Sequence, residues 1–165
     1  MKSTLLYALG SLLLLGGTTA CSKEDPAPDF YMRATKDATP WTGIGSGAYI
    51  KSSKQFYIFG QMGDISKAEV ITLKFSLLAS PQLAPVQALP ASWAELIGYD
   101  AASNSYETAD AASLPNIEVT RLDTVAKIVE GRFNAILVRD KHWTSQTENM
   151  NLTNGSFRVQ YKEVQ

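Results

Sequence analysis

Strict alternation of apolar and polar residues is the feature that most constrains how this chain folds. In EVITLKFSLL (residues 69–78), Ile71, Leu73 and Phe75 occupy every second position and polar residues separate them. This period of two is typical of a β-strand with one buried face. The aromatic segment QFYIFGQM (residues 55–62) comes just before it, with the polar turn MGDISKAE between the two. We expect these segments to form an antiparallel pair of strands.

The C-terminal part of the chain repeats this pattern. IEVTRLD (residues 117–123) is one expected strand, and AKIVEGRFNAILVR (residues 126–139) is a longer one with Gly131 in its interior. An interior glycine indicates a bulge or bend, which allows one strand to serve two sheets. In NMNLTNGSFRVQY, the dipeptide Asn154 and Gly155 predicts a hairpin turn, and a further alternating strand follows it.

The middle of the chain is interrupted by prolines and turn residues. SPQLAPVQALPASW (residues 80–93) holds three prolines, which favours a loop or an edge segment because proline cannot donate to a central ladder. AELIGYDAASNSYETAD (residues 94–110) predicts a hairpin with Ser103 and Asn104 at its tip. No stretch after the N-terminal segment has sustained helical periodicity.

Together these segments predict an all-β fold, an antiparallel β-sandwich of about 8–10 strands. We prefer the sandwich because the long strand interrupted by Gly131 suits a strand that bends between two packed sheets. A small β-barrel is the alternative, and its closure needs several such bends. No linker or internal repeat divides the sequence, so residues 30–165 are expected to form a single β-domain.

The first residues have the order of a secretory signal peptide. Lys2 is followed by the apolar run LLYALGSLLLLGG and then by the small residues TTA directly before Cys21. The uninterrupted apolar part, from Leu5 to Leu15, is shorter than the roughly 20 residues that a membrane-spanning helix needs. TTAC resembles a bacterial lipobox, with Thr18 where leucine is usual, and implies diacylglycerol attachment to Cys21. A plain signal peptide with an incidental cysteine is the alternative.

Cys21 is the only cysteine of the chain, so no disulfide competes for its thiol. We expect residues 1–20 to be a lipoprotein signal peptide and residues 21–29 to be a flexible tether, with acyl chains on Cys21 holding the protein on a membrane. The SKED run after the cysteine resembles the lysine-and-acid run of surface-exposed lipoproteins of the Bacteroidetes type. It implies a protein anchored by lipid in the outer membrane and facing outward; a periplasm-facing orientation is the alternative.

Three segments carry a resemblance to other proteins. They are FYMRATKDATPWTG (residues 30–43), IEVTRLDTVAKIVEGRF (residues 117–133) and LTNGSFRVQY (residues 152–161), which ends in Gly-x-Phe-x-Val-x-Tyr. These segments resemble those of small Bacteroidetes-type lipoproteins of unknown function. The resemblance implies a secreted, lipid-anchored β-domain without an assigned activity, and it supplies no catalytic residues.

The distribution of charge and of reactive side chains argues against several functions. The formal charge is −1 and the charged residues are spread singly, so no basic stripe predicts a nucleic-acid partner. GIGSGA (residues 43–48) matches a dinucleotide fingerprint, but no helix pattern follows it, and we expect a hairpin turn there and no cofactor. His142 is the only histidine, which argues against a zinc site and against a serine or cysteine triad. The chain is therefore predicted not to be an enzyme.

The tryptophans are candidate contacts for a ligand outside the cell. Trp143 lies beside His142 in the polar segment RDKHWTSQTEN, and this pair is the candidate ligand platform. Trp41 is instead expected in the core. The alternatives are that the tryptophans cap the ends of the core and that His142 is a solvated loop residue without a function.

The tripeptide DTV, residues 123–125, is a candidate modification site. It resembles the short Asp-Ser/Thr-aliphatic acceptor for O-glycosylation in secreted Bacteroidetes proteins, which places the sugar on Thr124. The alternative is a turn in which the Asp123 carboxylate caps backbone amides.

The predicted function is that of a lipid-anchored cell-envelope lipoprotein whose β-domain is non-catalytic and has a binding or structural role. The sequence does not identify its extracellular ligand or protein partner. One alternative is a glycan-binding accessory module, which requires two coplanar aromatic rings on one exposed face. A second alternative is a glycan hydrolase, which requires two carboxylates about 5–10 Å apart in a cleft. The isolated acidic residues are Asp64, Asp100, Glu107, Asp110, Asp123 and Glu130.

Overall fold

The computed structural model describes residues 29–64, 66–77, 86–98, 101–145 and 147–165. These residues form nine strands and no helix, which confirms the all-β prediction and its range of strand numbers. The strands are β1 (Tyr31–Lys36), β2 (Thr39–Ile50), β3 (Gln55–Met62), β4 (Lys67–Leu77), β5 (Val86–Ile97), β6 (Ala101–Glu107), β7 (Asn116–Asp123), β8 (Ile128–Arg139) and β9 (Asn149–Val164). The predicted signal peptide and Cys21 lie outside the described residues. The described part of the chain has no helix long and apolar enough to cross a bilayer.

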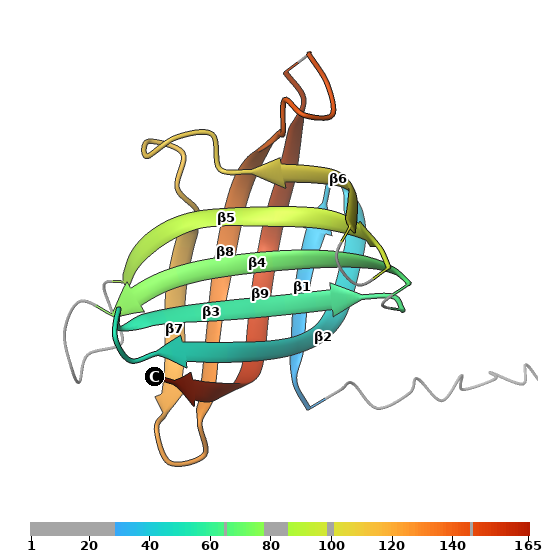
Figure 1. The fold of residues 1–165 in the computed structure, drawn as a ribbon. Helices are drawn as coiled ribbons and strands as arrows, with labels where there is room; N and C mark the ends of the chain where they lie inside the picture. The colour runs from blue at the N-terminus through green and yellow to red at the C-terminus, as the bar shows by residue number, and fades with distance from the viewer. Residues whose placement is uncertain (1–28, 65, 78–85, 99–100, 146) are drawn as a thin grey trace, which may run out of the picture.

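The strands form one continuous sheet that closes on itself (Figure 1). Each strand from β1 to β5 pairs antiparallel with the next one, and β6 passes to β8 through the pairs Tyr106–Arg139 and Glu107–Val138. β8 pairs with β9, which completes the ring by pairing antiparallel with β1 and parallel with β2. β7 pairs with β8 alone among the described strands.

The ring has two layers. In Figure 1, β2 to β6 run across the front, and β1, β7, β8 and β9 run crosswise behind them. The two layers expected of a sandwich are therefore present as halves of a single hydrogen-bonded sheet, packed crosswise. β8 joins the halves, because its first part pairs with β7 and its last two residues pair with β6.

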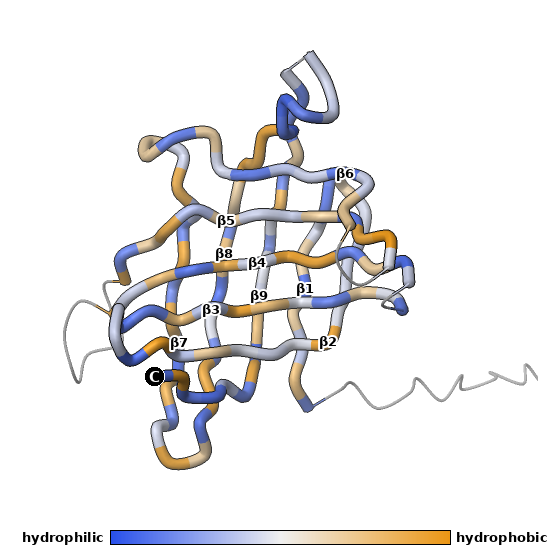
Figure 2. The backbone as a smooth tube through the Cα atoms, viewed as in Figure 1, coloured by the Kyte–Doolittle hydropathy of each residue, from blue (hydrophilic) through white to orange (hydrophobic). Residues whose placement is uncertain are grey.

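Alternation along the strands places one core between the halves. On β4 the three predicted residues Ile71, Leu73 and Phe75 are fully buried. Phe157 and Val159 of β9 face them from the other half, and the ring centres of Phe75 and Phe157 are 6.3 Å apart. Figure 2 shows hydrophobic and hydrophilic residues alternating along many of the strands. The interior is thus filled from both layers by apolar and aromatic side chains.

The glycine-rich segment 43–48 lies inside β2, so the hairpin turn expected there is wrong. A Cβ atom on Gly43 would lie 2.8 Å from the indole of Trp41, and one on Gly60 would lie 2.9 Å from it. These glycines of β2 and β3 leave room for the Trp41 ring, which is 2% exposed and confirms its predicted place in the core. The glycines are therefore present for close packing, not for a phosphate-binding turn.

Asn154 and Gly155 form a bulge and not the predicted hairpin turn. They lie within β9, and the registers of both neighbouring strands shift by one residue next to them. Asn154 has a φ of 51°, which asparagine tolerates better than most residues. Asn154 does adopt the positive φ that the Asn-Gly pair favours in a turn. Pairing with β1 and β8 on both sides nevertheless keeps the strand continuous.

Two other expected irregularities are placed differently. The hairpin predicted for residues 94–110 is formed by β5 and β6, but Ser103 and Asn104 lie within β6. Gly98, which directly follows β5, is a turn residue with a φ of 76°, and residues 99–100 lie outside the described residues. Near Gly131 the register shift is on the partner strand β7. A Cβ on Gly131 would lie 2.5 Å from the Phe157 ring, so this glycine also makes room for an aromatic side chain.

Candidate functional site

A charged cluster lies inside the ring, near the ends of its strands. Glu69 of β4 reaches the core, where its Oε2 accepts hydrogen bonds from Trp41 Nε1 at 3.1 Å and Trp93 Nε1 at 3.0 Å. The same oxygen forms an ion pair with the ammonium of Lys36, the last residue of β1. That ammonium is also 4.7 Å from the centre of the Trp93 ring, a cation–π distance. The two charged side chains are 22% and 24% exposed.

A second polar cluster continues from the first. The Tyr106 ring meets Trp93 edge to face, with centres 5.7 Å apart. The Tyr106 hydroxyl donates to Glu148 Oε2 at 3.3 Å, and Arg139 Nη1 donates to the same oxygen at 2.8 Å. Burial, with the negative charge of Glu148 next to it, raises the pKa of Tyr106. Arg139 also donates to the side chain of Asn104 on β6, at 3.1 Å.

Both clusters are suited to closing an end of the ring. Among the described residues, no buried side-chain nitrogen or oxygen lacks a hydrogen-bond partner. Polar groups that are fully paired stabilise a fold and define its packing. The described residues also contain no group of three or more histidines, cysteines or acids that could hold a metal ion. We therefore assign the two clusters a structural role, and the candidate functional site lies on the outer surface.

The outer surface of β3 carries two aromatic rings. Phe56 and Ile58 face the core, so Tyr57 and Phe59 point away from it. Their ring centres are 6.4 Å apart and their planes differ by 30°. Both side chains are half-buried within the sheet surface. Tyr57 and Phe59 thus form a nearly parallel aromatic pair on the outer surface of this half of the sheet.

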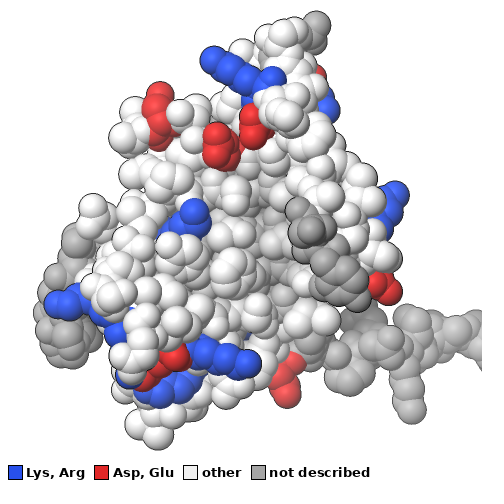
Figure 3. Space-filling model, viewed as in Figure 1, with Lys and Arg blue, Asp and Glu red and all other residues white. Residues whose placement is uncertain are grey.

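The neighbours of these rings are small and mostly uncharged. Phe59 lies between Ser46 of β2 and Thr72 of β4 in the strand register. Tyr57 pairs with Lys74, whose ammonium is 5.7 Å from the centre of the Tyr57 ring. On β2, Ile44 is 69% exposed. We call the surface formed by Ile44, Ser46, Tyr57, Phe59, Thr72 and Lys74 the outer aromatic face. Figure 3, drawn from this side, shows a largely uncharged surface with most acidic and basic side chains toward its edges.

The predicted platform, His142 and Trp143, lies in the loop between β8 and β9. His142 is exposed and Trp143 is half-buried. Trp143 Nε1 donates to Ser105 Oγ at 2.9 Å, and Ser105 faces outward because its neighbour Tyr106 faces the core. The two rings of the pair are perpendicular, with an interplanar angle of 90° and centres 4.9 Å apart. Their role in binding stays a prediction.

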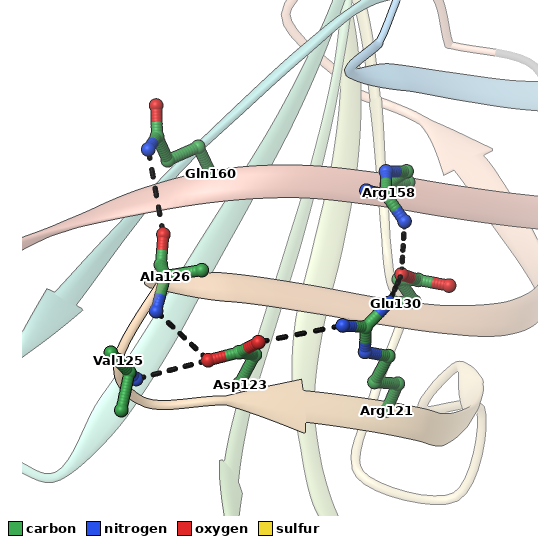
Figure 4. Close-up of polar contacts among 7 residues, drawn as sticks. All are labelled: Arg121, Asp123, Val125, Ala126, Glu130, Arg158 and Gln160. Atoms are coloured by element: carbon green, nitrogen blue, oxygen red, sulfur yellow. Dashed lines mark hydrogen bonds and ion pairs between the residues drawn. The ribbon is translucent and has the colours of Figure 1, made fainter.

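The tripeptide 123–125 forms the turn between β7 and β8 (Figure 4). Asp123 Oδ1 accepts hydrogen bonds from the backbone amides of Val125 at 3.0 Å and Ala126 at 2.8 Å. These bonds, chiefly the one from Ala126, lower the pKa of Asp123. The alternative interpretation, an aspartate that caps a turn, is thus observed. Thr124 is exposed and Val125 is 92% exposed; glycosylation of Thr124 stays a prediction.

The strands beside this turn are joined by ion pairs (Figure 4). Glu130 of β8 contacts Arg121 of β7 at 3.2 Å and Arg158 of β9. Two other acids considered for hydrolysis are engaged in turns of their own. Asp64 accepts from the amide of Ser66, and Asp110 accepts from the amides of Ala112 and Ser113. Asp100 lies outside the described residues.

The sequence interpretation identified the aromatic strand at residues 55–62 but not its outer rings. In FYIF, aromatic or aliphatic residues occupy both phases of the alternation, and only Gln55 and Gln61, near the ends of the strand, share the phase of Tyr57 and Phe59. A half-buried strand with apolar residues in both phases must leave one set of apolar side chains on its outer face. This was the signal that could have identified the outer rings. No family model, curated protein or solved structure matches the chain. Membership in the lipoprotein group that it resembles therefore stays a prediction.

Proposed function

We propose that this chain is a lipid-anchored lipoprotein of the outer membrane whose β-domain is non-catalytic and binds a ligand outside the cell. Cys21 carries the anchor in this proposal, and the outer aromatic face is the binding surface. The single observation that carries the binding role is the pair of rings of Tyr57 and Phe59, 6.4 Å apart, on an outer face whose one charged side chain is Lys74.

The composition of the face supports binding more than a purely structural role. Exposed apolar surface is unfavourable in water, and contiguous apolar patches on soluble surfaces are commonly binding sites. Here Ile44 is 69% exposed and pairs with Gln61, two residues from Phe59 on β3. The inward-facing clusters around Glu69 and Glu148, in contrast, have their polar groups paired within the fold.

Single cysteines placed on the protein test whether the face is occupied in the envelope. An acylated Cys21 leaves no free thiol in the chain, so each new cysteine is the only reactive one. We expect Thr72→Cys, on the face, to react with maleimide several-fold more slowly in isolated envelopes than after purification in detergent. Thr153→Cys is the matched control, because Thr153 is an exposed threonine on β9 of the other half. Equal rates for Thr72→Cys in the two states contradict a bound ligand on this face.

The same control variant tests the orientation. A membrane-impermeant maleimide added to intact cells should label Thr153→Cys if the domain faces outward. Labelling that needs prior permeabilisation of the outer membrane places the domain in the periplasm instead.

Metabolic labelling with an alkyne fatty acid tests the anchor. The wild-type chain should be labelled and should sediment with membranes, because acyl chains bury many methylene groups in lipid. Cys21→Ala should be unlabelled. A wild-type chain that carries a free thiol at Cys21 overturns the anchor.

A further inference from the structure

The outer aromatic face has features that identify the chemical class of its ligand. The centres of its two rings are 6.4 Å apart and their planes differ by 30°, so one bound molecule can contact both. The face of an aromatic ring carries partial negative charge. The axial C–H groups of a pyranose carry partial positive charge, so a sugar ring stacks on such a surface. Peptide side chains have no comparable flat array of C–H groups flanked by hydroxyls.

The side chains beside the rings complement hydroxyl groups. Ser46 and Thr72 flank Phe59 across the sheet, and the side chain of Gln61 follows it on the same strand. Hydroxyl and amide groups both donate and accept hydrogen bonds, as sugar hydroxyls require. Lys74 is the one ionic group of the defined face, and its ammonium is directed at the Tyr57 ring. Such a surface favours a neutral ligand, because it has no cluster of cations to pair with an acidic one.

A second aromatic side chain lies on the same outer side of the sheet. Trp143 packs against Ser105 on the outside of β6, three strands away from β3 in the sheet order. Phe59 aligns through Thr72 and Ser92 with Glu107, two residues from Ser105 on β6. Three strand spacings of about 4.8 Å and two residue steps of about 3.4 Å separate the two places by about 16 Å. Thr72 of β4 and Ser92 of β5 face each other in the register between them. A chain of several sugars that crosses the strands can therefore contact Phe59 and Trp143 together.

We infer that the outer aromatic face binds a neutral polysaccharide, with sugar rings on Tyr57 and Phe59 and an extended chain reaching Trp143. This inference rests on the proposed function and specifies its ligand. It moves the centre of glycan binding from the loop pair His142 and Trp143 to β3.

Affinity electrophoresis of the acylated full-length protein in mild detergent tests the inference. The probes are three soluble neutral polysaccharides, hydroxyethyl cellulose, galactomannan and amylopectin, with polygalacturonate as the acidic comparison. At least one neutral probe should retard the wild type, and polygalacturonate should not. Phe59→Ala and Tyr57→Ala should each raise the dissociation constant about tenfold, the order expected for loss of one stacked ring.

Ile136→Ala is the matched control variant. Ile136 is an apolar residue that is 56% exposed on β8 of the other half, where it pairs with Asn151 of β9. This variant should bind as the wild type does, and Phe59→Tyr should retain binding because it keeps the ring. Thermal unfolding of each variant checks the fold. Trp143→Ala should weaken binding to the polymer but not to a disaccharide of the same sugar, which is too short to span both places.

Several outcomes overturn the inference. They are no retardation by any neutral probe, retardation that Phe59→Ala leaves unchanged, and retardation by polygalacturonate alone. Sedimentation that shows a dimer of the wild type and a monomer of Phe59→Ala identifies a second copy of the chain as the occupant instead. If Thr72→Cys is protected in envelopes while no neutral probe binds, the proposed function stands and the glycan is wrong. If Thr72→Cys is unprotected and no probe binds, both fail.

Discussion

Glu69 shows how single residues hold one end of the ring. Its carboxylate accepts from two buried indole N–H groups and pairs with the Lys36 ammonium. A buried donor that loses its acceptor costs about 1–3 kcal/mol. The acid is therefore retained in the interior because its partners depend on it.

Replacing this acid by an apolar residue of similar size tests the dependence. Glu69→Leu should lower the free energy of unfolding by about 3 kcal/mol, since two indole N–H groups and an ammonium lose their acceptor. Urea denaturation of the full chain measures the change. Glu118→Leu, at an exposed position of β7, is the control and should change stability by about 0.5 kcal/mol or less. Equal changes in the free energy of unfolding for the two substitutions would contradict a stabilising role of Glu69.

Gly60 provides a second test at this scale. A Cβ on Gly60 would lie 2.6 Å from the Cβ of Met32 and 2.9 Å from the Trp41 ring, and both side chains are buried. Gly60→Ala should destabilise the protein by about 1–3 kcal/mol through overpacking. Gly47→Ala has a nearest contact of 3.2 Å, to a methyl group of Val159, and should cost less. The midpoints of thermal unfolding rank the two variants, and the reverse order contradicts this packing argument.

The positions of some of these residues could be predicted from the sequence, and those of others could not. Trp41 could be placed in the core because it follows Pro40 in a stretch, residues 38–50, without a charged residue. Glu69 could not, since a glutamate in an alternating strand is normally assigned to solvent, and its two indole partners come from β2 and β5. Tyr57 and Phe59 were missed because aromatic or aliphatic residues fill both phases in the centre of their strand.

Among the elements, β9 combines a bulge with pairing on both sides. Asn154 has a φ of 51°, while β1 and β8 continue beside it. The Asn-Gly pair carries the dihedral preference of a turn, but whether the chain reverses there depends on pairing with β8 and with β1, which lies more than a hundred positions earlier. For that reason the sequence indicated a hairpin where the fold has one uninterrupted strand.

Substitution at Asn154 tests the role of this backbone conformation. Asn154→Val should lower the free energy of unfolding by about 1–2 kcal/mol, because a β-branched residue is strained at positive φ. Asn154→Gly should be tolerated. Thr153→Val, at the preceding exposed position, is the control and should have little effect. Urea denaturation compares the three, and an Asn154→Val variant as stable as the control argues against a strained position.

Across the whole molecule, the last strand connects distant parts of the chain by charge as well as by pairing. Glu163, near the end of β9, pairs with Lys51 beyond β2 at 2.7 Å and with Lys127 of the β7–β8 turn at 2.5 Å. The hydrogen bond from Lys127, followed by the one from Lys51, lowers the pKa of Glu163 from 4.5 to about 2. A carboxyl with a lowered pKa stabilises the fold above its unfolded pKa, and this contribution is lost as the pH falls toward the folded value.

The pH dependence of stability follows from this shift. Between pH 4.5 and 2 the wild type should lose more stability than Glu163→Gln, whose side chain does not titrate. Denaturation midpoints measured across this range at low salt should therefore converge at the acid end. High salt should reduce the difference near neutral pH, because the pairs are exposed and screened. Parallel pH profiles for the two proteins would contradict the linkage.

The fold class and the range of strand numbers could be predicted because alternation is a local property. The closure could not, since it depends on the pairing of β9 with β1 and β2 from the opposite end of the sequence. The sandwich and barrel alternatives differ only in such long-range pairs. For the same reason the outer aromatic face, which collects residues from three strands, could not be assembled from the sequence alone.

The pairing of Tyr31 with Arg158 has a consequence for biogenesis. A ribosome releases the N-terminus first, so β1 and β2 lack this partner until β9 has been synthesised. Contacts this distant in sequence also form slowly. The sheet cannot close on itself while the sixteen residues of β9 are missing. Premature folding is thereby delayed, and the nascent chain stays incompletely folded until then.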